Sequence, residues 1–254
     1  GWPWDERHKL SMWSDAVVSD ERVTGKADLT LEERQLMAAE IFETFSRLWQ
    51  ERLDDGVESF DLIRLMQKDP NTRDLINDPV MFIGNLMLLI VGGNDTTRNS
   101  MTGGVVFFNE NPREFEKLRN ETSLIPSMVS EVIRFQTPLP HMRRTLTRDF
   151  EFKGHRMKEG DKVVLWYCSA NRDEAVIKNP DSFVIDRESP RNHASFGFGI
   201  HRCMGNRLAE MQLRVLWEEC LDLFESIEVQ AEPKRLSNNF VRGYSELEVV
   251  VKRH

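Results

Sequence analysis

The sequence has few cysteines, no excess of positive charge and no long uninterrupted apolar segment. Its three cysteines, Cys168, Cys203 and Cys220, stand far apart in 254 residues and form no Cys-x-x-Cys pair. This spacing argues against a disulfide framework and a thiolate zinc cluster, and reduced thiols are typical of a cytoplasmic protein. The 42 acidic residues outnumber the 34 basic ones, which gives a net charge of −8. An acidic balance argues against nucleic-acid binding as the main function.

No repeat, low-complexity tract or Gly/Ser linker marks a domain boundary, so we expect one domain over residues 1–254. The most apolar run, residues 86–91, directly follows Asn85 and is followed by two glycines, Asn94 and Asp95. That run is too short and too polar at its end for a bilayer, so the pattern predicts a buried helix and no membrane span. The chain begins with Gly1 and has no signal-peptide pattern, so we expect it to be a piece of a longer protein.

Helices dominate the first half of the chain. Thr30 and Glu33 have the spacing of a capping box, and apolar residues follow at helical intervals. Those residues are Met37, Ile41, Phe45, Leu48 and Trp49. Asp78 and Pro79 have the character of an N-cap and a first helical position. They predict a long central helix over about residues 79–109.

Short strands follow residue 149. Alternating and aromatic residues predict strands at 150–152, 163–167 and about 247–251, with turns at 153–154 and 159–161. A further helix is expected from about Gly205 to Phe224, with one apolar stripe. The stripe consists of Leu208, Met211 and Val215. The fold class is therefore α+β and mainly helical.

The segment 196–205, Phe-Gly-Phe-Gly-Ile-His-Arg-Cys-Met-Gly, carries the strongest chemical signal. Gly197 and Gly199 permit a tight bend and close approach of a flat ligand. Cys203 stands just before a predicted helix, whose positive N-terminus favours a thiolate. A shielded thiolate on such a loop suits an axial iron ligand. Two other interpretations are an inert buried cysteine and a zinc site with His193 and His201, for which no fourth ligand is apparent.

Two further patterns are weaker on their own. Glu131 and Arg134 lie three residues apart on one helical face, which also fits an exposed surface pair. Gly92 and Gly93 inside a helix suggest close approach or a local bend, and Asp95 with Thr96 offers an acid beside a hydroxyl. Simple helix packing through small residues is the alternative for that segment.

The cysteine segment resembles the haem-binding loop of the cytochrome P450 family at Phe196, Gly199, His201, Cys203 and Gly205. The resemblance implies haem b as the cofactor, with the Cys203 thiolate as the axial iron ligand. It places His201 at a haem propionate and gives the other positions a role in binding the haem. The matching motifs extend over residues 79–250 in the order of the family.

The same resemblance assigns roles outside this loop. Glu131 and Arg134 match the Glu-x-x-Arg helix of the family, whose partner arginine is Arg187. Asp95 and Thr96 match the acid and alcohol that relay protons during oxygen activation, and Arg144 matches a propionate-binding arginine. The resemblance also implies apolar substrate walls, which would be formed by Leu89, Gly93, Thr97, Leu139, Met142, Phe240 and Val241.

The sequence of residues 92–101, 141–145 and 199–203 is similar to that of the soluble bacterial alkane terminal hydroxylases. This similarity implies hydroxylation of the end methyl of medium-chain alkanes with O2 and electrons from a ferredoxin and its NADH-dependent reductase. Other apolar substrates, such as a fatty acid or a terpene, and a non-catalytic haem-thiolate sensor or binding module remain alternatives. So does a helical scaffold that binds no haem.

The positive charge between residues 187 and 214 suits either an acidic electron donor or an ordinary solvated face. Members of the family are much longer than this chain. The chain is therefore expected to be the C-terminal portion of such an enzyme, with the first helices and strands missing, and to bind haem weakly or not at all on its own.

Overall fold

The computed structural model describes residues 2–18, 30–54, 56 and 60–254. Contacts divide the chain into two compact units, residues 1–95 and 96–254. The long helix α5, Pro79–Glu110, continues through the boundary between them. The single domain expected over the whole chain stays a prediction.

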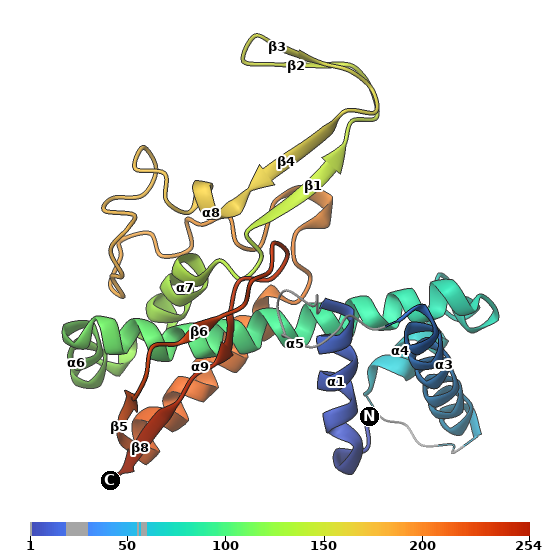
Figure 1. Ribbon diagram of the computed structural model, residues 1–254, viewed down its shortest axis with the longest axis horizontal. Coiled ribbons are helices and arrows are strands. Elements are labelled where there is room, and N and C mark those ends of the chain that lie inside the picture. The colour runs from blue at the N-terminus through green and yellow to red at the C-terminus, as the bar shows by residue number, and fades with distance from the viewer. Residues whose placement is uncertain (1, 19–29, 55, 57–59) are drawn as a thin grey trace. The chain divides into compact units, whose positions relative to one another are not determined.

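The first unit is helical (Figure 1). Its elements are η1 (Trp4–Glu6), α1 (Arg7–Val18), α3 (Leu31–Asp54), α4 (Leu62–Lys68), η2 (Leu75–Asn77) and the first half of α5. Aromatic and aliphatic side chains from these helices form its core. They are Trp13, Ile41, Phe45, Leu48, Trp49, Ile63, Met66, Phe82, Leu86 and Met87.

Both predicted helix starts in this unit are confirmed. The Thr30 Oγ1 accepts a hydrogen bond from the Glu33 backbone N–H (3.1 Å), and the Glu33 carboxylate accepts one from the Thr30 N–H (2.7 Å). At α5, the Asp78 carboxylate accepts a bond from the Met81 N–H (3.1 Å). Each cap satisfies backbone donors that the first helical turn leaves without a partner.

The second unit places helices around one core and adds four two-stranded sheets. Its helices are the rest of α5, α6 (Pro112–Asn120), η3 (Thr122–Leu124), α7 (Ile125–Gln136), α8 (Tyr167–Ala170), η4 (Gly199–His201) and α9 (Asn206–Leu223). The core is built from α5, α6, α7, α9 and the segment around Phe183. The Phe183 ring contacts both Phe107 and Phe108 of α5, with ring centroids 5.4 Å apart in each pair.

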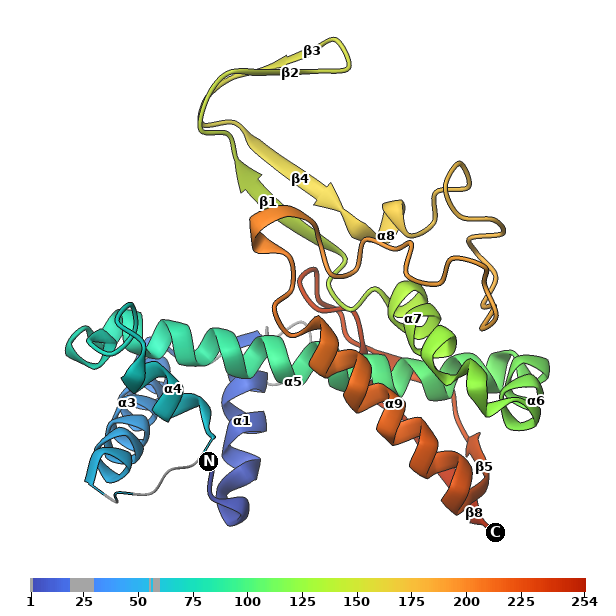
Figure 2. The same ribbon diagram turned by 180° about the vertical axis from the view of Figure 1, so that it is seen from behind.

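All four sheets are antiparallel pairs. They pair β1 (His141–Thr145) with β4 (Lys162–Trp166), β2 (Phe150–Phe152) with β3 (His155–Met157), β5 (Phe224–Val229) with β8 (Val249–Arg253), and β6 (Lys234–Arg235) with β7 (Tyr244–Glu246). The β2–β3 hairpin continues from the far end of the β1–β4 ribbon (Figure 2). The predicted strands are confirmed to within a few residues, and Tyr167 begins α8 instead of ending a strand. The α+β, mainly helical class is confirmed.

The predicted apolar stripe of α9 does not face the core. Leu208, Met211 and Val215 are 55, 48 and 46% exposed, whereas Leu213 and Trp217 are buried. The buried pair lies on the face of α9 that contacts α7 and α5, so the position of these neighbours determines which side is covered.

A Cβ at Gly92 or Gly93 would meet no described atom within 4 Å, so the close approach or local bend expected there stays a prediction. Close approach to α5 occurs about three turns later. A Cβ at Gly103 would lie 2.5 Å from the Gln136 side chain, and one at Gly104 would lie 2.9 Å from the Trp217 ring.

By length and composition, α5 is the one helix among the described residues that could cross a membrane. The same helix contributes buried side chains to the core of each unit, such as Phe82 in the first unit and Val106 in the second. Such contacts are also typical of a central helix in a globular protein. The expected absence of a membrane span stays a prediction.

Candidate functional site

Cys203 is carried on a sharply bent loop. Gly197 and Gly199 have φ angles of +66° and +79°, which a side chain would strain, so the bend predicted from the glycines is confirmed. A Cβ at Gly197 would lie 2.9 Å from the Tyr167 hydroxyl. The Cys203 N–H donates to the Phe196 carbonyl (2.9 Å) and closes the loop. The thiol is free and exposed, three residues before α9 begins, so the inert buried cysteine is excluded.

Large apolar side chains around Cys203 face water. Phe198, Ile200 and Met204 are 67, 98 and 86% exposed. Such a cluster on one short loop is unfavourable in water and is typical of a surface that a ligand or partner covers. An exposed thiol among apolar side chains fits a flat, apolar group whose metal takes a soft sulfur ligand. The residues present therefore fit a haem.

The support for this loop begins at Glu131, which is fully buried on α7. Its carboxylate accepts two bonds from Arg134 (2.7 and 2.8 Å) and one from Arg187 Nε (2.9 Å). It also accepts the Val184 N–H (2.8 Å). The structure thus brings together the three residues of the predicted Glu-Arg-Arg set, and burial excludes the exposed surface pair. Paired, hydrogen-bonded charges of this kind fix one backbone arrangement around them.

Asn171 is a positioning residue that the sequence analysis missed. It is fully buried, and its amide donates to Thr137 Oγ1 and Ser195 Oγ, both at 2.8 Å. Its side-chain oxygen accepts the Ala194 N–H (2.6 Å), and Ser195 donates to the Ile133 carbonyl (2.9 Å). These bonds tie the end of α7 to the residues directly before Phe196. No motif in the sequence signals them, because the partners are far apart along the chain.

Asp95 is buried on α5, 1% exposed, and accepts a hydrogen bond from Ser14 Oγ on α1 (2.6 Å). Both residues belong to the first unit. Ser14 lies 81 residues away in sequence and was also missed. Thr96, the other member of the predicted acid and alcohol pair, is half-buried, and its carbonyl accepts the Ser100 hydroxyl (2.8 Å).

The remaining predicted haem and substrate residues are less constrained. Arg144 is half-buried on β1, where Nη1 donates to the Arg143 carbonyl (3.0 Å), and His201 is exposed in η4. The predicted substrate residues vary in exposure. Thr97 and Val241 are buried, Leu89, Leu139 and Met142 are half-buried, and Gly93 and Phe240 are exposed.

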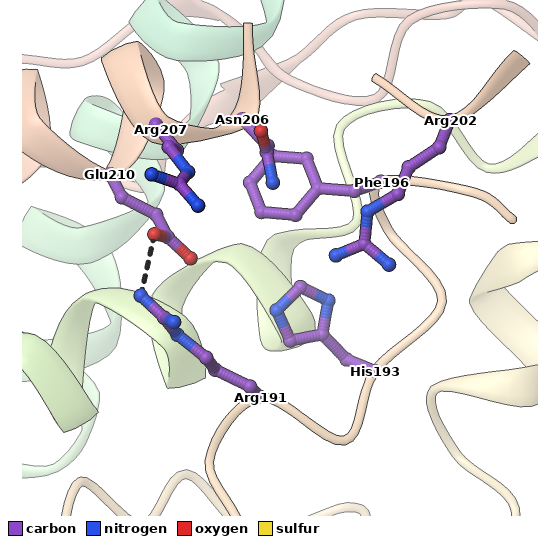
Figure 3. Close-up of a pocket in the computed structure, with 7 residues that line it drawn as sticks. All are labelled: Arg191, His193, Phe196, Arg202, Asn206, Arg207 and Glu210. Carbon is purple, nitrogen blue, oxygen red and sulfur yellow. Dashed lines mark hydrogen bonds and ion pairs between the residues drawn. The ribbon is translucent and has the colours of Figure 1, made fainter. Parts of the chain in front are cut away.

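A pocket of about 550 Å³ lies beside the loop, in the second unit (Figure 3). Its walls are Arg191, His193, Phe196, Arg202, Asn206, Arg207 and Glu210. Arg191 pairs with Glu210 (2.8 Å) across it. Burial and the nearby Arg134 lower the pKa of His193 to about 4, so this imidazole is neutral at pH 7.

The structure bears on two interpretations that the sequence left open, the basic segment 187–214 and the zinc site. Arg187 is only 11% exposed at its side chain, so the basic segment 187–214 presents one arginine fewer at its surface. No group of three or more His, Cys, Asp or Glu side chains that could hold a metal ion occurs within the described ranges. The zinc interpretation with His193 and His201 therefore finds no support.

These features define a mainly helical protein that presents a cysteine thiol on a glycine-bent loop among apolar side chains. Residues 31–251 match the sequence profile of the family described as Cytochrome P450. The solved structure of a Cytochrome P450-153 from Novosphingobium aromaticivorans superposes with a TM-score of 0.86 at 43% identity, covering 99% of this chain and 60% of that one. The chain belongs to the cytochrome P450 family, whose members are haem-thiolate monooxygenases.

Curated relatives agree with this membership. A linalool 8-monooxygenase of Pseudomonas putida is 43% identical over 170 residues, which are 67% of this chain and 42% of the relative. A methyl-branched lipid omega-hydroxylase of Mycobacterium tuberculosis is 41% identical over 165 residues, 64% of this chain and 38% of the relative. The chain thus spans about 40% of the length of these two relatives.

Proposed function

We propose that this chain is the C-terminal portion of a haem b monooxygenase that hydroxylates the terminal methyl of medium-chain alkanes or related apolar chains. The observation that carries the proposal is the exposed Cys203 thiol, held by a bent loop among water-exposed Phe198, Ile200 and Met204. Haem would supply the redox chemistry that activates O2 when it is bound. The Cys203 thiolate is the residue that holds its iron, and Phe196 and the glycines at 199 and 205 shape the loop around it.

The buried hydrogen bonds of Glu131 and Asn171 hold the segments that precede that loop against α7. Arg144 and His201 each offer a cationic or hydrogen-bonding group that suits a propionate carboxylate. Among the described residues, Arg144 makes one side-chain hydrogen bond, to a neighbouring carbonyl, so its guanidinium retains donors for such a ligand.

Asp95 and Thr96 are proposed to move protons from the protein interior toward the oxygen-binding side. Ser14 holds one oxygen of the Asp95 carboxylate, which fixes the side-chain rotamer of the acid. A Cβ built on Gly92 or Gly93 meets no atom within 4 Å, and this supports a ligand lying against α5 at that point.

The proposed substrate is apolar because the predicted wall residues are mainly aliphatic or aromatic. The sequence of residues 92–101 and 199–203 supports terminal oxidation of an alkane. The relative named an omega-hydroxylase also supports a chain end as the site of oxidation. The relative named linalool 8-monooxygenase favours a second candidate, a terpene alcohol, over the same site. A fatty acid is a third candidate of the same chemical kind.

The proposed partners are a ferredoxin and its NADH-dependent reductase in the cytoplasm. Arg191, Arg202, Arg207 and Arg214 leave positive charge on the surface near the cysteine loop, in a chain that is acidic overall. Such local charge steers an acidic protein.

The test begins with the carbon monoxide difference spectrum of the reduced protein reconstituted with haem. The chain, a version completed at its N-terminus, and Cys203→Ser in each are compared. A thiolate-type Soret band lost in Cys203→Ser supports the axial ligand, and its absence from both lengths contradicts the haem proposal.

Turnover of octane, linalool and a fatty acid with a ferredoxin system then identifies the substrate. Thr96→Ala should keep the Soret band and reduce product formation relative to peroxide release. A Thr96→Ala variant with unchanged turnover, or an intact spectrum without turnover of any substrate, would favour the sensor or binding module.

A further inference from the structure

The pocket in Figure 3 is separate in its lining from the proposed haem ligand, because Cys203 is not among its walls. Its side chains come from the segment 191–202 and from the first two turns of α9. The two segments bring three guanidinium groups and one carboxylate to one cavity, a net of two positive charges.

Two of these guanidinium groups have no anionic partner among the residues that the structure describes. Arg191 is paired with Glu210, but no side-chain hydrogen bond or ion pair of Arg202 or Arg207 is found in the described part of the chain. The Arg202 guanidinium makes only a distant contact with the Phe198 ring, 5.9 Å from its centroid. Figure 3 shows Arg202 pointing toward His193 and Arg207 lying near the Glu210 carboxylate.

The other walls supply an imidazole, an aromatic ring and an amide. The Nδ1 atom of His193 is buried, and no described group hydrogen-bonds to it. The Phe196 ring packs against this imidazole, with centroids 5.5 Å apart. Asn206 adds an amide at the start of α9, where the first turn has no acidic residue and no side-chain cap. A buried polar atom without a partner is unfavourable, and a ligand oxygen would satisfy it.

We propose that this pocket binds a phosphate-type oxyanion, either inorganic phosphate or a phosphate monoester. A dianion matches the net charge of the lining, and the planar forks of Arg202 and Arg207 match pairs of phosphate oxygens. The 550 Å³ volume exceeds that of a phosphate ion, which leaves space for the organic part of an ester. Glu210 is the competing internal anion, since it already holds Arg191.

Calorimetric titration of the 254-residue chain at constant ionic strength tests this site, first with inorganic phosphate and then with phenyl phosphate. We expect saturable binding of one ion per chain. Arg202→Gln and Arg207→Gln should each weaken it about tenfold or more, the usual effect of losing a charged hydrogen bond. Glu210→Gln should strengthen it, because a repulsive charge is removed and Arg191 is freed.

Arg214→Gln is the matched control, an arginine on the same helix that is half exposed and paired with Glu218 outside the pocket. Its phosphate affinity should stay within about twofold of the parent, the range expected of a screened surface charge. Circular dichroism verifies that each variant is folded, and the two pocket arginines test the site independently of each other.

Tighter binding of phenyl phosphate than of phosphate would identify an ester as the ligand. Absence of saturable binding to both ligands would overturn the proposal. Equal weakening by Arg214→Gln would do the same, since it indicates a diffuse charge effect. The pocket arginines also belong to the surface proposed for the acidic electron donor. Binding of polyglutamate that phosphate does not displace would show that they serve that surface alone, and it would reject the phosphate site.

Discussion

Replacing Glu131 by Gln should destabilise the second unit strongly, although the two side chains have nearly the same shape. The carboxylate is fully buried and accepts four hydrogen bonds, three of them from the guanidinium groups of Arg134 and Arg187. A Gln amide retains one acceptor oxygen and turns an NH2 group toward donors. Two buried cations lose their counter-charge, and breaking a buried pair in this way costs about 3–5 kcal/mol.

Urea denaturation of the chain, followed by circular dichroism, measures this change. Whole domains unfold with only about 5–15 kcal/mol, so the variant should lose a large part of its stability. The control is Glu51→Gln on α3, whose partner Arg47 is 2.9 Å away and half exposed. That exposed pair should contribute at most about 0.5 kcal/mol. If Glu131→Gln loses less than about 1 kcal/mol, the cluster does not have the role that its geometry implies.

Three further changes have expected outcomes. The His193 pKa of about 4 lies below the value near 6.5 of an unfolded histidine, so the unfolded chain binds more protons than the folded chain between these pH values. The free energy of unfolding should therefore fall by up to about 3 kcal/mol as the pH drops from about 6.5 to 4. In denaturation curves measured across this range, His193→Gln should remove this pH dependence. Gly104→Ala should lower the free energy of unfolding by about 1–3 kcal/mol, because its Cβ would meet the Trp217 ring at 2.9 Å. Gly84→Ala on the same helix meets no atom within 4 Å and should raise the free energy of unfolding by about 0.5–1 kcal/mol. Equal melting temperatures of the two variants would contradict this reasoning. Thr30→Ala should lose about 1 kcal/mol of helix stability, measured by thermal unfolding, and no loss would mean that the capping box contributes nothing.

The sequence determined those features that depend on neighbouring residues. The Thr30 capping box, the Asp78 cap, the start of α5 and the bend at Gly197 and Gly199 are local, because the atoms that satisfy each other lie within a few residues. The motif around Cys203 identified the family for the same reason, since its specificity lies in one short segment. Most strands were also found from local alternation and turn residues.

The tertiary structure decided which surfaces are covered. Nothing local shows that α9 buries Leu213 and Trp217 instead of Leu208, Met211 and Val215, because the choice depends on where α5 and α7 lie. The places on α5 where a Cβ would clash are Gly103 and Gly104, not Gly92, because only packing brings the Gln136 side chain and the Trp217 ring there.

Long-range hydrogen bonds also had to come from the structure. The Asn171 bonds and the Ser14–Asp95 bond join residues that are tens of positions apart, and no periodicity encodes such pairs. Arg187 was predicted as a partner of Glu131 only through the resemblance to the family. The arginine pocket follows the same logic, since one loop and one helix end contribute its walls. The sequence therefore determined the residue types and their local conformation, and the packing of distant segments decided which of these residues act together.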